Sequence, residues 1–289
     1  MNLPMQPDED AVRLMMARLE DRAQRRVVEH RGTRVVWRRF GNGPPRVMLH
    51  GGHGSWLHWI RNVDALSRDH ALWLPDMPGY GDSDALEGDP RAQDRMERLV
   101  DVVCATLDTL VGSSTPVDLG GFSFGGLAAA LVAARRGQVR RLALIGAGGH
   151  AGARRQTIDL VDWRRLDDRN ERLAAFARNL VPFMIHDARR ADAMALAIHA
   201  SACERTRFRS KEIALAGGLR EALDRIEAPV LLLWGEHDVT AVPREIGAHL
   251  VQGHARRRFE IVPDAGHWAQ YEAADAVNAR LCGWFDPAG

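Results

Sequence analysis

The sequence lacks an excess of charge of either sign. Its 289 residues include 39 lysine and arginine residues and 38 aspartate and glutamate residues, for a formal net charge of +1. A nucleic-acid-binding domain usually shows a basic face or a high pI, so this balance argues against a nucleic-acid partner. Only one of the 39 cationic residues is a lysine, Lys211. We attribute this arginine bias to genomic base composition and not to a guanidinium site.

Cysteines are scarce, and long apolar runs are missing. Cys104, Cys203 and Cys282 are an odd number without metal-ligand spacing, so they predict no disulfide framework. The longest apolar runs, such as 127–134, are far shorter than the ~18 residues of a spanning helix. The first dozen residues are acidic and lack the basic start and apolar stretch of a signal peptide. We therefore expect a soluble, cytoplasmic protein with no membrane partner.

Hydrophobic residues make up 46% of the chain, enough to bury a substantial core. At ~150 residues per domain the length suggests two units, but single α/β domains reach ~250 residues, so one domain with an insertion fits as well. The sequence has no internal repeat. It has instead a recurring order of short apolar run, glycine-rich turn and helical pattern. The runs cover residues 46–49, 71–74, 117–119, 142–145, 230–234 and 259–262.

The first five runs are almost entirely apolar, which is typical of strands buried on both faces of a parallel sheet. Ahead of them, residues 27–29 and 33–40 flank Arg31-Gly32 and predict an edge hairpin. Amphipathic helices are predicted between the runs, as in the 3-4-4 spacing of Met96, Leu99, Val100, Val103, Leu107 and Leu110. This alternation predicts an open, doubly wound α/β sheet.

Two segments depart from the alternation. Residues 1–26 predict an extra helix whose apolar stripe contains Val12, Met15, Met16, Leu19 and Ala23. Such a stripe usually packs on its own domain; packing on a partner subunit is the alternative, so a homo-oligomer stays open. Residues 149–217 are helical throughout and predict a cap over the carboxyl ends of the strands, where open sheets bind ligands. The core is then 27–148 and 218–289.

A possible nucleophile lies in the pattern Gly121-x-Ser123-x-Gly125, between a buried strand and a helix of small residues. The chain must turn sharply there, and the flanking glycines remove side chains that would collide. This turn would lift the serine hydroxyl above the sheet edge at a helix N-terminus. The backbone N–H of Phe124 would then point to where an oxyanion could form.

A serine nucleophile needs a base, and the base needs an acceptor that fixes its tautomer. His267 lies in a loop just after the last strand run and is our predicted base. Asp238 follows the run 230–234 and is our predicted acceptor, with Glu236 as the competing acid two residues nearer the strand. The preceding loop, 146–150, contains no acid.

The glycine-rich loop after the run 46–49 is predicted to supply a second oxyanion donor. We expect the Gly52 amide to pair with that of Phe124, and His53 is an alternative. His50, His53 and His58 lie close together, but no carboxylate or further histidine stands at matching spacing. We therefore predict no metal.

A substrate pocket for a small molecule is predicted next to the nucleophile. Large apolar residues of the cap and of the loop after the last strand suggest an apolar lining. The predicted pocket residues are His53, Trp163, Phe183, Met184 and Trp268.

Taken together, the motifs resemble those of the α/β-hydrolase family. They are His50-Gly-Gly, Asp76-Met-Pro-Gly-Tyr-Gly-x-Ser, Gly-Phe-Ser123-Phe-Gly-Gly, Gly-Glu-His-Asp238 and Gly-His267-Trp. They occur in the family's order over about residues 27–285, and the order Ser, Asp, His is the family's. The resemblance implies an eight-stranded, mostly parallel sheet flanked by helices, with 149–217 as its helical cap. We interpret Asp76 and Asp84, in the second motif, as turn-capping residues.

Within this family the chain is similar both to carboxylic-ester hydrolases and to carbon–carbon hydrolases of ring-cleavage products. A serine at position 123 argues against haloalkane dehalogenases and epoxide hydrolases, which carry aspartate there. The carbon–carbon hydrolases typically have asparagine before the serine, where this chain has Phe122. We therefore predict a cofactor-independent serine esterase. A carbon–carbon hydrolase is the first alternative, and a non-catalytic ligand-binding member of the fold is the second.

Overall fold

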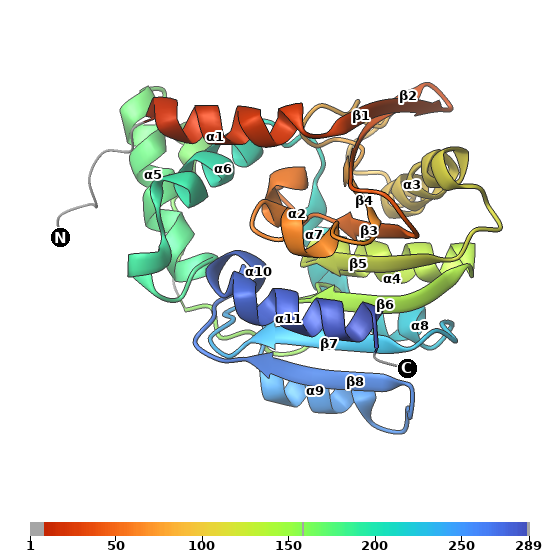
Figure 1. Cartoon of the computed structure of the whole chain (residues 1–289). Coiled ribbons are helices and arrows are strands. Elements are labelled where there is room, and N and C mark those ends of the chain that lie inside the picture. The colour runs from red at the N-terminus through yellow and green to blue at the C-terminus, as the bar shows by residue number, and fades with distance from the viewer. Residues whose placement is uncertain (1–8, 158, 288–289) are drawn as a thin grey trace.

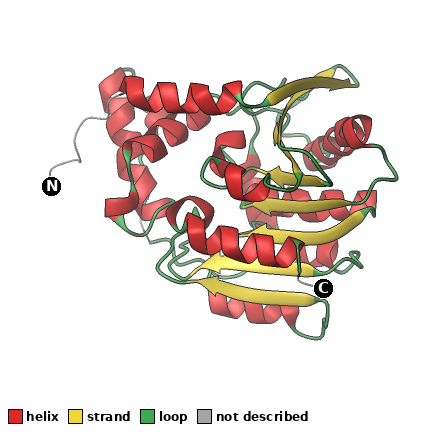
Figure 2. Ribbon diagram, viewed as in Figure 1, coloured by secondary structure: helices red, strands yellow, loops and turns green. Residues whose placement is uncertain are grey.

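The computed structural model describes residues 9–157 and 159–287, which form an eight-stranded sheet between layers of helices (Figures 1 and 2). The strand order is β1-β2-β4-β3-β5-β6-β7-β8. β1, β2 and β4 pair antiparallel, and all other neighbours pair parallel, so the predicted mostly parallel sheet is confirmed. The strands are β1 (Gln24–His30), β2 (Thr33–Phe40), β3 (Pro45–Leu49), β4 (Ala71–Asp76), β5 (Val117–Phe122), β6 (Val139–Ile145), β7 (Val230–Gly235) and β8 (Arg257–Val262).

Burial of both sheet faces explains the apolar runs. Every residue of β4, β5 and β7 is buried. One face packs against α3 (Arg95–Val111), α4 (Phe124–Arg136), α8 (Leu219–Leu223) and α9 (Pro243–Val251). The other packs against α2 (Val63–Leu66), α10 (Ala269–Glu272) and α11 (Ala274–Phe285), with the 3₁₀ turn η1 (Trp56–Trp59). The hydrophobic core is thus two apolar layers separated by the sheet.

Between β6 and β7 the described residues include helices and no strand. The prediction of helix throughout 149–217 is wrong at its start, because residues 149–157 and 159–162 form neither helix nor strand. The segment contains α5 (Arg169–Phe183), α6 (Ala193–Glu204), α7 (Ser210–Ala216) and the 3₁₀ turns η2 (Trp163–Arg165) and η3 (Ala188–Arg190). In Figure 1 the arrows of β7 and β8 point toward the side of the molecule where α5 and α6 lie. None of the described helices combines the length and apolar content needed to span a membrane.

The N-terminal helix is shorter than predicted. α1 (Glu9–Asp21) ends five residues before the expected boundary, and residues 24–26 already belong to β1, paired with residues 37–39 of β2. The part of the prediction on residues 1–8 lies outside the described residues. The sequence pattern did not indicate that β1 begins at Gln24. This edge strand is exposed and polar at its start, so its residues show no apolar alternation there.

The predicted stripe is partly buried, and on one side only. Met16, Leu19 and Ala23 pack against the layer that contains α2 and α11, and α1 lies along α6 (Figure 1). Met15, in contrast, is 61% exposed. The helix therefore packs on its own chain, as the first of the two alternatives predicted.

A buried guanidinium group fixes α1 to the sheet. Arg38 on β2 is 3% exposed and forms ion pairs with Glu20 at 2.7 Å, with Asp76 at 2.9 Å and with Asp82. Asp76 also accepts the backbone N–H of Asp82 at 3.0 Å, within the turn that follows β4. Asp84, the other predicted turn residue, pairs with Arg34 at 2.9 Å.

Replacing Arg38 by methionine is expected to lower the free energy of unfolding by about 3–5 kcal/mol, because the buried carboxylate of Asp76 loses its counter-charge. Chemical denaturation measures the change. The control is Arg13→Met, which removes an exposed pair with Asp10 and should cost under about 1 kcal/mol. Equal losses in the two variants would contradict the assigned role of Arg38.

Candidate active site

Ser123 occupies a strained turn between β5 and α4. Its backbone lies at φ 54° and ψ −120°, a region that residues with a side chain rarely adopt. The turn is held by Ser123 N donating to Ile145 O at 2.8 Å and by Ser123 O accepting from Gly126 N at 2.9 Å. A Cβ on Gly125 would collide with the backbone oxygen of His50. The glycine two residues after the serine is therefore needed for close backbone approach, as the sequence predicted.

The structure brings the three predicted catalytic side chains together. Ser123 Oγ lies 2.9 Å from His267 Nε2, and His267 Nδ1 lies 2.8 Å from Asp238 Oδ2. His267 is 3% exposed and Asp238 is fully buried. An ionised carboxylate only accepts hydrogen bonds, so Nδ1 carries the imidazole hydrogen and Nε2 is free to accept the serine proton.

Thr240, which the sequence analysis did not single out, orients the acid. Its backbone N–H and its hydroxyl both donate to Asp238 Oδ1, each at 2.7 Å. Burial alone would raise the pKa of the Asp238 carboxyl, but the charge of His267 and the hydrogen bonds from His267 and Thr240 lower it below its usual range. Asp238 therefore stays ionised and directs Oδ2 to the imidazole.

The competing acid points elsewhere. Glu236 is half-buried, and its carboxylate lies 3.5 Å from the guanidinium of Arg244 and 3.5 Å from the backbone nitrogen of Asp264. Asp238 is thus the acid that meets the imidazole, as predicted from the order of the loops.

Two backbone amides next to the serine are free to donate. Within the described part of the chain, neither Phe124 N–H, at the start of α4, nor Gly52 N–H has a protein acceptor. A Cβ on Gly52 would lie 3.5 Å from the Cβ of Phe124, so the two residues are neighbours. The amide of Gly51, in contrast, donates to His58 Nδ1 at 3.1 Å. The predicted pair, Gly52 and Phe124, is therefore available to donate to an oxyanion. The amide of His53, the predicted alternative, also has no acceptor among the described residues.

The three histidines of the glycine-rich region have different surroundings. His50 donates through Nδ1 to Gly51 O at 2.8 Å and accepts Met77 N–H through Nε2 at 2.9 Å. His53 has a positive φ of 49° and lies 3.3 Å from Arg164 of the cap. Burial, with the charges of Arg164 and Lys211, lowers the pKa of His53 to about 4. At neutral pH it is therefore an uncharged imidazole on the cap side.

A small cavity adjoins the imidazole of His267. It has a volume of about 120 Å³ and is lined by residues 181–186, His237, Val239, Gly266 and His267. Phe183 and Met184, two of the predicted pocket residues, line this cavity, and the Phe183 ring is 5.8 Å from the His267 ring.

The other predicted pocket residues do not line this cavity. Trp268 is fully buried, stacks on Tyr271 at 4.2 Å and donates its indole N–H to His58 O at 3.1 Å. Trp163 packs on Phe176 at 5.0 Å. Both indoles serve packing, which residue type and position alone could not distinguish from ligand contact.

A larger cavity of about 400 Å³ lies between α1, α6 and the loop 55–57. Its lining includes none of Ser123, His267 and Asp238. Of the charged groups that line it, Glu20, Asp76 and Asp82 all pair with Arg38. The smaller cavity, which His267 lines, is therefore the candidate substrate site.

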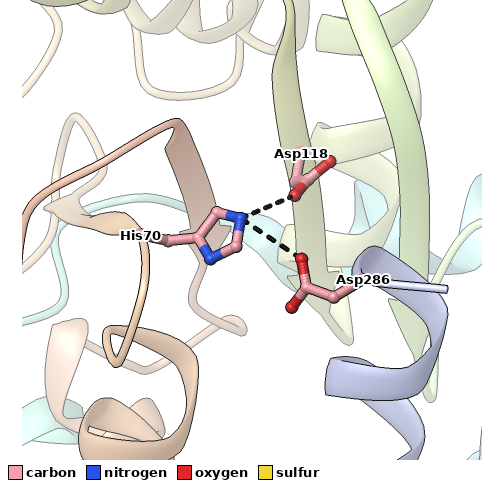
Figure 3. Close-up of side chains that lie close together, drawn as sticks. All are labelled: His70, Asp118 and Asp286. Atoms are coloured by element: carbon pink, nitrogen blue, oxygen red, sulfur yellow. Dashed lines mark ion pairs between the residues drawn. The ribbon is translucent and has the colours of Figure 1, made fainter. Parts of the chain in front are cut away.

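Two clusters of the described residues have side chains close enough to ligate a metal. In the first, His70 Nε2 lies 3.2 Å from Asp286 and 4.0 Å from Asp118 (Figure 3). Arg46 donates to both oxygens of Asp286 at 2.9 Å, and Arg140 pairs with Asp118 at 2.8 Å. Two guanidinium groups thus already balance these carboxylates.

The second cluster is Glu236, His237 and Asp264, near the cavity beside His267. The imidazole of His237 is stacked on that of His186, with ring centres 3.6 Å apart. Glu236 pairs with Arg244, as described above. We assign no metal to either cluster.

The strained conformation of Ser123 predicts an unusual order of stability. Replacing Ser123 by glycine should give a protein more stable than the Ser123→Ala variant by about 1 kcal/mol, since glycine alone adopts this backbone without strain. Urea denaturation of the two variants measures the difference. An alanine variant as stable as the glycine variant, or more so, would contradict the strain.

Comparison with known proteins identifies relatives of the whole core. The family model described as "Alpha/beta hydrolase family" matches residues 47–280. The chain is 30% identical to a 2-hydroxymuconate semialdehyde hydrolase of Pseudomonas sp. (strain CF600), over 88% of this chain and 90% of that protein. It is 28% identical to a 2-hydroxy-6-oxononadienedioate/2-hydroxy-6-oxononatrienedioate hydrolase of Paraburkholderia phymatum, over 81% and 84% of the two chains.

Solved structures of two kinds share the fold. An esterase from Rhodococcus sp. ECU1013 superposes with a TM-score of 0.73 at 23% identity, covering 93% of this chain and 100% of that one. A meta-cleavage product hydrolase from Pseudomonas fluorescens IP01 superposes with a TM-score of 0.71 at 21% identity, covering 91% and 98%. At these identities the likeness extends to the fold alone.

Proposed function

Because this chain belongs to the α/β-hydrolase family of enzymes, we propose that it hydrolyses small carboxylic esters through Ser123, His267 and Asp238. The observation that carries the proposal is the unbroken hydrogen-bonded series from Ser123 Oγ through the imidazole to Asp238, with contacts of 2.9 and 2.8 Å. Such a series turns a weakly nucleophilic alcohol into a reactive one.

In the first half of the reaction, His267 Nε2 takes the Ser123 hydroxyl proton as Oγ attacks the ester carbonyl carbon. Negative charge develops on the carbonyl oxygen, where the amides of Gly52 and Phe124 donate hydrogen bonds. The imidazolium that forms is stabilised by ionised Asp238. It then protonates the leaving alkoxide, so that an alcohol departs and an acyl-enzyme remains.

In the second half, His267 takes a proton from water, and the resulting hydroxide attacks the acyl carbonyl. The same amides stabilise the second oxyanion, and Ser123 Oγ leaves with the proton from the imidazolium. Every proton and every charge in this cycle is handled by a side chain or amide of the chain itself, so the proposed reaction uses no cofactor. Its partner is the small-molecule substrate.

The acyl group is proposed to occupy the 120 Å³ cavity beside His267. Phe183 and Met184 supply an apolar wall there. Phe122 does not line the cavity; it is 1% exposed and packs on His267, with ring centres 4.9 Å apart. An apolar surrounding of this kind suits a short hydrocarbon acyl chain.

A carbon–carbon hydrolase is the second candidate. The curated relatives described above are named as hydrolases of 2-hydroxy-oxo acids. In this chain, Arg164 of the cap lies 3.3 Å from His53, and the positive charge of Lys211 helps to lower the pKa of the same histidine. Both cations could balance a carboxylate on such a substrate. Phe122 offers no polar group for a second substrate oxygen, and for this reason we favour the ester.

Replacing Ser123 by alanine is expected to lower kcat for p-nitrophenyl acetate at least about 10³-fold, since the residues of such a site act as a unit. The release of p-nitrophenol measures the rate. Ser114→Ala, which alters an exposed serine, is the control and should keep the wild-type rate. A Ser123→Ala variant with near-normal turnover would refute the nucleophile, and a folded wild type without turnover would favour a ligand-binding protein.

The cavity volume predicts a preference for short acyl chains. Because added methylenes must be forced into a filled site, we expect kcat/KM to fall at least about tenfold between the p-nitrophenyl esters of butyrate and octanoate. A vinylogous 1,5-diketone belongs in the same panel. If the diketone reacted with a higher kcat/KM than every ester, the hypothesis of a carbon–carbon hydrolase would replace that of an esterase.

A further inference from the structure

A buried carboxylate lies behind the predicted base and is not used in the mechanism above. Glu272, the last residue of α10, follows His267 by five positions and is 5% exposed. Its Oε2 accepts hydrogen bonds from Gly266 N at 2.6 Å and from His186 N at 3.0 Å. Its Oε1 accepts one from Asp187 N at 2.7 Å.

No cationic side chain forms an ion pair with this carboxylate within residues 9–157 and 159–287. Arg190, the nearby cation, donates instead to the backbone oxygens of Asp264 and of Glu272 itself, at 3.1 and 3.5 Å. The negative charge of Glu272 is therefore balanced by three backbone amides. Hydrogen bonds to an ionised acceptor are stronger than those between neutral groups, so the amides are held firmly.

The three amides come from two separate parts of the chain. Gly266 N–H precedes His267 in the loop after β8. His186 and Asp187 follow α5 and continue the segment whose Phe183 and Met184 line the cavity. The carboxylate thus joins the loop that carries the base to the segment that forms the wall of the acyl cavity.

These two segments also touch directly through their backbones. Trp268 N donates to Met184 O at 2.7 Å. A Cβ on Gly266 would lie 2.7 Å from the backbone nitrogen of His186, so only glycine permits the approach. With no side chain between the two segments, their spacing is set by these amide hydrogen bonds.

We propose that Glu272 is a positioning residue that holds the His267 loop and residues 184–187 in one fixed arrangement. It does not touch the substrate; it keeps the imidazole and the wall of the acyl cavity at the spacing that the reaction needs. The catalytic part of this inference rests on the proposed function. Misplacement of a catalytic group by about 1 Å can cost ~10² in rate, so a loosened loop should show mainly in kcat.

The test compares Glu272→Gln with the wild type. Glutamine keeps the size but has one acceptor oxygen, and its NH₂ group would face an amide N–H that now has no acceptor. We expect kcat for p-nitrophenyl butyrate to fall at least about tenfold, with a smaller change in KM. Hydrogen exchange followed by mass spectrometry should become faster in peptides covering 184–187 and 264–268.

The matched control is Asp168→Asn. Asp168 is also a carboxylate that accepts two backbone amides, from Asn170 and Glu171 at 2.8 and 2.9 Å, but it caps α5 on the exposed side of the cap. Its substitution should leave kcat within about twofold of the wild type and leave exchange in 264–268 unchanged.

Glu272→Asp keeps the charge on a shorter side chain and covers the case in which the glutamine variant fails to fold. Its kcat should lie below that of the wild type, and above that of the glutamine variant where both fold. Folded variants with faster exchange but wild-type kcat would overturn the positioning role. Unchanged exchange would overturn the link between the two segments. A wild type without turnover would refute the proposed function, and hydrogen exchange would still decide whether the link exists.

Discussion

The proposed active site depends on the backbone conformation of one residue, Ser123. At φ 54° the chain reverses at once from β5 into α4, and this places the hydroxyl at the end of the strand and the Phe124 amide beside it. The strain is sustained by the buried strand and helix on either side, and by flanking glycines that let backbones approach closely. A serine in a relaxed turn would have neither the exposure nor the adjacent amide.

The sheet topology then determines which other residues can reach that hydroxyl. β5, β6, β7 and β8 are consecutive neighbours and run parallel, so the loops after β7 and β8 emerge on the same side as the turn after β5. Asp238 lies near the start of the loop after β7, and His267 lies near the end of the loop after β8. Their separation from Ser123 along the chain is thus a consequence of strand order, and the site is assembled by the same packing that stabilises the fold.

Most strands and the loops of the proposed site could be predicted from sequence, since apolar runs and glycine-rich turns indicate local structure directly. They predicted β3–β8, the cap and the loops that carry Ser123, His267 and Asp238. They could not reveal Thr240 or Glu272, whose importance lies in contacts made across the fold. They also misplaced the end of α1, because an exposed edge strand carries no apolar alternation, and they could not tell the packing of Trp163 and Trp268 from contact with a ligand.

The most direct test of the account is covalent labelling of the folded protein with a fluorophosphonate, followed by peptide mapping. We expect a single labelled residue, Ser123. Labelling should slow by orders of magnitude when His267 is replaced by alanine, since the hydroxyl then loses its base. Folded wild-type protein that stays unlabelled, or that reacts at the same rate without the imidazole, would contradict the account.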